Sequence, residues 1–157
     1  MNHRPVILEV VARPLYLLIL AAAIVVLLRG HNEPGGGFIA GLLAVTASVL
    51  WAVAHGSDAA RRRLPSGSAV RLAAGGVLVG AIAGLPGLLG GQAYMTHLWV
   101  DLPLGFTTLP LSTVLVFDIG VFLCVWGSLA GYTLALLQAE GEPAADGPDA
   151  DDDGRNA

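Results

Sequence analysis

Residues 29–41 read RGHNEPGGGFIAG and separate two long apolar segments. The three successive glycines, Gly35, Gly36 and Gly37, would each destabilise a helix by about 1 kcal/mol relative to alanine. Glycine also adopts backbone angles that other residues avoid, and it lets a second backbone approach closely. The stretch therefore predicts a bent connection at the mouth of a membrane helix, or a tight contact between protein segments. A flexible surface loop is the plainer alternative.

The bulky residues around the glycines suggest how the connection is held. Pro34 restricts φ to about −65° immediately before the glycines. Phe38 is the first large side chain after them and could anchor the run in a pocket. A phosphate-binding loop is disfavoured, because the glycines lead directly into an apolar helix and no Lys-Ser/Thr pair follows them.

The composition indicates an integral membrane protein. Of the 157 residues, 55% are hydrophobic and only 13% are charged, about half the charged share of a soluble domain. Four apolar runs approach the length needed to cross a bilayer. We expect an all-α fold with four transmembrane helices, located in the cell membrane as a multi-pass protein. Their predicted ranges are about 7–28, 37–55, 69–89 and 112–137, with a break near Pro86.

The end of the chain differs in character from the rest. Residues 138–157 contain seven carboxylates and one arginine, with no hydrophobic periodicity. Such composition is typical of disorder. We therefore divide the chain into a four-helix membrane domain, 1–137, and a disordered acidic cytoplasmic tail, 138–157.

The arginines predict the orientation in the membrane. Four helices place both termini on one side, and six arginines fall on that side against Arg29 alone on the other. The positive-inside rule then predicts that both termini are cytoplasmic. The three consecutive arginines could instead form a patch for acidic lipid, but we favour the orientation signal. The six are Arg4, Arg13, Arg61, Arg62, Arg63 and Arg71.

Small residues at four-residue spacing predict close helix packing, which drives association in lipid. The fourth predicted helix has a small face on one side and the carboxylate of Asp118 on the bulky opposite side, so we expect it to pack on two sides. The glycines expected to pack are Gly41, Gly76, Gly80, Gly84, Gly127 and Gly131.

Few residues in the membrane domain carry chemistry. A buried Asp normally pairs or lines a pathway, so Asp118 is either structural or handles protons or cations. We expect it to meet another subunit or water. His97 could titrate near neutral pH, but it lacks the companions of a metal site. We expect no metal, no cofactor, no nucleic-acid partner and no enzymatic catalysis.

Three stretches carry a resemblance to a known family. The run GHNEPGGGFIAG resembles the signature of the MnhB-type subunits of Mrp (also called Mnh) multisubunit cation/proton antiporters. The Thr96-His97 pair and residues 117–122, FDIGVF, resemble two later motifs of that family. The resemblance extends over about residues 15–137, with Ala40-Gly41 as a mild departure.

The resemblance implies an accessory membrane subunit, which supports assembly and ion exchange at a subunit interface. Its partners would be the other subunits of the antiporter and the lipid bilayer, and the complex would exchange Na⁺ for H⁺. The residues implied in ion transport or in the interface are His31, Pro34, Gly35, Gly36, Gly37, Phe38, His97 and Asp118.

Two other functions stay open at this point. A related subunit could serve a membrane-bound hydrogenase-like complex in which redox energy drives ion transport. A free-standing small channel, or a lipid-binding membrane protein, is the second alternative. The several close-packing faces and the lack of a charged helical path disfavour it.

Overall fold

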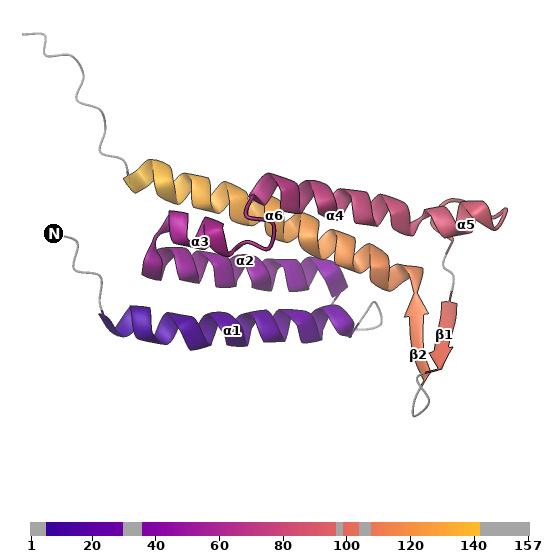
Figure 1. The fold of residues 1–157 in the computed structure, drawn as a ribbon, viewed down its shortest axis with the longest axis horizontal. Coiled ribbons are helices and arrows are strands. Elements are labelled where there is room, and N and C mark those ends of the chain that lie inside the picture. Colours follow the sequence, from indigo (N-terminus) through magenta and orange to yellow (C-terminus); the bar gives the residue numbers. More distant parts are fainter. Residues whose placement is uncertain (1–5, 30–35, 97–98, 104–107, 142–157) are drawn as a thin grey trace, which may run out of the picture.

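The computed structural model describes residues 6–29, 36–96, 99–103 and 108–141 (Figure 1). Four helices in this part are long and apolar enough to cross a membrane, which confirms the predicted fold class. The helices are α1 Val6–Leu28, α2 Gly36–His55, α3 Ser57–Arg63, α4 Ala69–Ala83, α5 Leu85–Leu89 and α6 Thr113–Gly141, and the strands are β1 Trp99–Pro103 and β2 Thr108–Ser112.

The long helices pack in the order α1, α2, α6, α4, as a row of neighbours (Figure 1). Helix α6 thus packs between α2 and α4, as the two faces of its sequence predicted. The start of α1, the ends of α2 and α6, and all of α3 lie at one end of the row; the hairpin and α5 lie at the other (Figure 1). Several core positions on α2 are alanines, which let its neighbours approach: Ala40, Ala44 and Ala47.

A buried hydrogen bond joins α2 to α6. The Nε1–H of Trp126 donates to the Oγ of Ser48 at 2.8 Å, and the Ser48 hydroxyl donates to the carbonyl of Ala44 at 2.9 Å. Both polar atoms therefore have partners inside the membrane domain, where an unpaired donor is costly. The sequence indicated Ser48 only as a small residue at a packing face.

The third membrane span breaks where the sequence predicted. Helix α4 ends at Gly84, and α5 begins at once with Pro86 in its first turn. The Tyr94 hydroxyl donates to the carbonyl of Ala81 at 2.8 Å, one of the carbonyls in the last turn of α4. The chain that follows α5 thus folds back on the break and satisfies a carbonyl there.

The connection before α6 contains strands that the sequence did not predict. Strands β1 and β2 form an antiparallel hairpin, in which Asp101 lies opposite Pro110. Pro103 and Pro110 argued against strands, since proline cannot donate to a ladder. A two-stranded hairpin has only edge strands, so the missing donors can lie on its outer sides.

Two boundaries also differ from expectation. The loop predicted after α2 contains the short helix α3, and α6 continues to Gly141, four residues beyond the domain boundary drawn at Leu137. The division into domain and tail stays a prediction, because residues 142–157 lie outside the described part. The cytoplasmic location of both termini likewise stays a prediction.

Candidate functional site at the start of α2

Asp118 is buried against the first turn of α2, with 3% of its surface exposed. A Cβ built on Gly36 would lie 3.8 Å from each of its carboxylate oxygens, and Gly36 has φ of 84°. This is the left-handed region that glycine enters without strain. The structure thus brings together two motifs that are about 80 residues apart in the chain.

Gly37 and Gly41 bring the backbones of α2 and α6 close together. A Cβ on Gly37 would overlap the backbone carbonyl of Asp118, and a Cβ on Gly41 would lie 2.8 Å from the Cβ of Val125. Real Cβ atoms do not make such contacts, so both positions require glycine at this helix separation. The two residues form one small face on α2, as expected for helix association in lipid.

The location of Asp118 is electrostatically favourable for a carboxylate. The first turn of a helix has unpaired N–H groups and a partial positive charge. A negative group there gains about 0.3–1 kcal/mol at exposed sites and up to about 2 kcal/mol when partly buried. Asp118 also lies near the start of α6, and burial of a charge costs less toward the end of a span than at its centre.

This arrangement corrects the expectation that Asp118 meets another subunit or water. The carboxylate lies inside the chain instead, because the side-chain-free start of α2 leaves room for it. The helical wheel had placed Asp118 opposite Gly120, which is correct, but it could not show that α2 covers that side.

Phe38 follows the two buried glycines and is 55% exposed. In the described part of the chain its ring therefore occupies no closed pocket. The ring instead extends the outer surface of α2 beside the Asp118 contact. His31, Pro34, Gly35 and His97 lie outside the described residues, and their expected roles stay predictions.

The remaining packing glycines lie at several kinds of contact. Gly76 lies against the backbone of Gly120 and Cys124, Gly127 against that of Ala69 and Ala73, and Gly131 against the side chain of Ala69. These three hold α4 to α6. Gly80 lies 3.8 Å from the Phe117 ring, measured from a built Cβ, and Gly84 lies against the Tyr94 ring and not against another long helix.

Sequence reasoning missed a cluster of rings at the end of α2. The Arg63 guanidinium lies 3.8 Å from the centroid of Trp51, and the same ring stacks on His55 at 4.0 Å. Tyr16 of α1 meets Trp51 edge-on at 5.3 Å. The four-residue spacing of Trp51 and His55 could have suggested their contact, but nothing local indicated which arginine would stack on them.

The described residues contain no group of three or more His, Cys, Asp or Glu side chains that could hold a metal ion. Asp118 is the one charged side chain among the buried residues of this part. The site is thus a helix contact built on glycine and one carboxylate.

Four spanning helices, joined through the contact between α2 and α6, define a multi-pass membrane protein. The chain belongs to the family of domains related to the MnhB subunit of the Na⁺/H⁺ antiporter, which matches residues 7–131.

Named relatives agree with this family. The corresponding Na⁺/H⁺ antiporter subunit of Bacillus subtilis is 33% identical over 139 residues, which cover 87% of this chain and 92% of the relative. The corresponding antiporter subunit of Alkalihalophilus pseudofirmus is 34% identical over 143 residues, covering 89% and 96%.

A solved structure of the Mrp complex from Dietzia sp. DQ12-45-1b contains a similar fold. The match has a TM-score of 0.70 and 33% identity, and it covers 91% of this chain. It covers 15% of the matched chain, so the present chain corresponds to one segment of a much longer polypeptide there.

Proposed function

We propose that this chain is an accessory membrane subunit of a Na⁺/H⁺ antiporter complex, where it supports assembly and ion exchange at an interface between subunits. Its family and its two named relatives support this function. The similar segment within a longer chain of the Mrp complex supports large membrane subunits as neighbours. The proposed role is assistance to transport and not catalysis.

The distribution of charge supports an accessory role. Polar and ionisable groups along a span are what mark a proton or ion pathway in membrane proteins. Among the described residues, Asp118 is the one buried charge. A single carboxylate cannot by itself carry ions across a bilayer, so the complete pathway is expected in partner subunits.

Within this role, we assign Asp118 to holding the start of α2. Its burial against Gly36 and Gly37 supports this assignment, and the partial charge of the helix terminus favours the ionised group. Fixing the start of α2 also fixes where the preceding Pro34–Gly35 run leaves the membrane domain and how Phe38 is presented. A proton- or cation-handling role for the same carboxylate is the competing assignment.

The test uses the complete set of antiporter subunits in a host without other Na⁺/H⁺ antiporters. Na⁺-dependent collapse of a proton gradient is followed in everted vesicles, and the subunits that co-purify with this chain are quantified. Removal of this chain should abolish exchange and weaken the complex. Unchanged exchange without the chain would contradict the proposed function.

Two substitutions separate the assignments of Asp118. Asp118→Asn keeps the volume and the hydrogen-bonding capacity but removes the charge. If the residue holds α2, Asp118→Asn should retain assembly and most exchange, whereas Asp118→Ala should reduce both. Normal assembly with abolished exchange in Asp118→Asn would instead assign the carboxylate to ion handling.

A further inference from the structure

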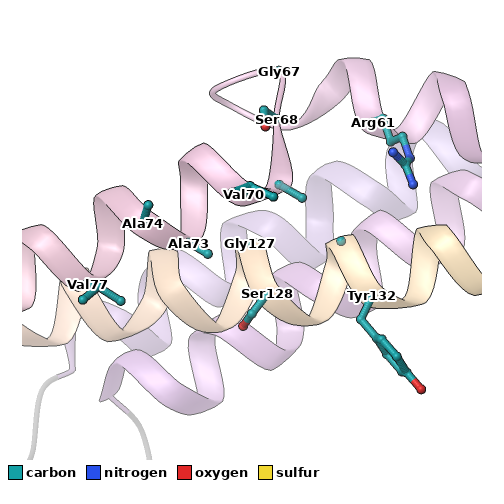
Figure 2. A pocket seen from close by; sticks show the side chains of 12 residues that line it. Arg61, Gly67, Ser68, Val70, Ala73, Ala74, Val77, Gly127, Ser128 and Tyr132 are labelled. Carbon is teal, nitrogen blue, oxygen red and sulfur yellow. The ribbon is translucent and has the colours of Figure 1, made fainter.

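A groove of about 650 Å³ lies between α4 and α6, at the end of the row where α3 is located. Figure 2 shows Arg61 at one end of this groove and Val77 at the other. Between them α4 contributes Val70, Ala73 and Ala74. The groove thus has one cationic end and an apolar floor.

The structure separates the three consecutive arginines of α3. Arg63 stacks on Trp51 and is committed to the packing of α2. Arg61 lines the groove, whereas Arg62 does not. Both Arg61 and Arg62 are exposed. The two arginines therefore have equal charge and similar exposure but differ in their relation to the groove.

The groove also crosses from the edge of the membrane domain into its interior. Arg61 lies in α3, outside the four spans, while Ala69 begins the third span and Val77 lies well within it. From Val70 to Val77 a helix rises about 10 Å. A ligand filling the groove therefore has its polar part at the depth of lipid headgroups and its apolar part among acyl chains.

The geometry points to a bound anionic phospholipid, with its phosphate at Arg61 and one acyl chain along Val70, Ala74 and Val77. Guanidinium groups bind phosphate through paired, charge-assisted hydrogen bonds. Tyr132, which also lines the groove, is a residue type typical of the headgroup level. The groove volume lies within the usual range for small-molecule sites.

The chemistry of the groove favours this occupant over others. A free phosphate would leave the apolar floor uncovered, and a purely apolar helix of another subunit would leave Arg61 without an anion. A phospholipid matches both parts with one molecule. The proposal does not depend on ion exchange, so it can be tested whether or not the complex transports Na⁺.

The test is native mass spectrometry of the full chain in its complex, supplied with phosphatidylglycerol or with zwitterionic phosphatidylethanolamine. The wild type should retain phosphatidylglycerol preferentially. Arg61→Gln should weaken phosphatidylglycerol binding about fivefold, as expected for loss of one basic residue. The matched variant Arg62→Gln should change binding less than twofold. Equal losses in the two variants, or no preference between the lipids, would overturn the proposal.

A second pair of variants tests the apolar floor. Ala74→Phe fills the groove and should release the lipid, whereas Leu78→Phe, on an exposed position of α4 outside the groove, should retain it. A photo-reactive residue at position 74 should crosslink to phosphatidylglycerol in native membranes. A crosslink to another protein subunit in its place would show that protein covers the groove, and the lipid assignment would be wrong.

Discussion

The Cα of Gly37 lies so close to the backbone carbonyl of Asp118 that any Cβ at position 37 would overlap this carbonyl. The contact joins the start of α2 to the first turns of α6. It also explains how a carboxylate is buried inside the membrane domain of this chain: glycines leave the space, and the start of a helix provides a favourable potential.

Gly37→Ala should displace α2 from α6 and lower the amount of assembled subunit severalfold. The added methyl group meets backbone atoms, which cannot move without shifting a whole helix. The measurement is the yield of subunit that co-purifies with its partners in mild detergent. Gly75→Ala is the matched control, because a Cβ at position 75 meets nothing within 4 Å. Equal yields from the two variants would show that the separation of α2 and α6 is not critical.

Gly80 and Gly120 face each other across α4 and α6 but should tolerate a methyl group differently. A Cβ on Gly120 would lie 2.5 Å from the backbone nitrogen of Gly80, whereas a Cβ on Gly80 would lie 3.8 Å from the Phe117 ring. Gly120→Ala should therefore lower the thermal stability of the purified subunit, and Gly80→Ala should leave it unchanged or slightly raise it. The reverse order would contradict the packing of these helices.

The hydrogen bond from Trp126 to Ser48 should contribute a measurable coupling between α2 and α6. We expect a double-mutant cycle of Ser48→Ala and Trp126→Phe to give a coupling of about 0.6 kcal/mol, the average for polar pairs in membrane helices. Reversible unfolding in mixed detergent micelles provides the free energies. Strictly additive effects of the two substitutions would exclude the coupling.

Phe38→Ala should reduce Na⁺/H⁺ exchange in everted vesicles more than it reduces the amount of subunit in the membrane. The ring is exposed in this chain, so its loss should weaken a contact with a partner more than the fold itself. Val53→Ala is the control on the same helix, because Val53 and Phe38 are both 55% exposed. If the two variants exchange equally well, the start of α2 is only a connector. Pro34→Ala should behave as Phe38→Ala does, if it holds the same run.

The orientation can be tested with reporter fusions. Alkaline phosphatase joined after Gly141, the last residue of α6, should be inactive if both termini are cytoplasmic. The same reporter inserted within residues 104–107 should be active, since that stretch lies on the opposite side in the predicted topology. The reverse pattern of activities would overturn the orientation derived from the arginines.

The sequence by itself determined the number and approximate limits of the membrane helices. Long apolar runs have little alternative to a helix in lipid, because each backbone group must be paired within its own segment. Glycine and proline around position 84 predicted the break after α4 for the same local reason. The hairpin escaped prediction because its prolines disfavour strands when each run is considered alone.

Only the tertiary structure decided which helices are neighbours and what Asp118 contacts. In a membrane protein nearly every helix surface is apolar, so hydropathy does not distinguish a face toward lipid from a face toward protein. The order α1, α2, α6, α4 depends on where small residues let two backbones meet. That pairing buries Asp118 under Gly36 and Gly37, and it separates Arg61 from Arg63, although adjacent positions in a sequence look alike.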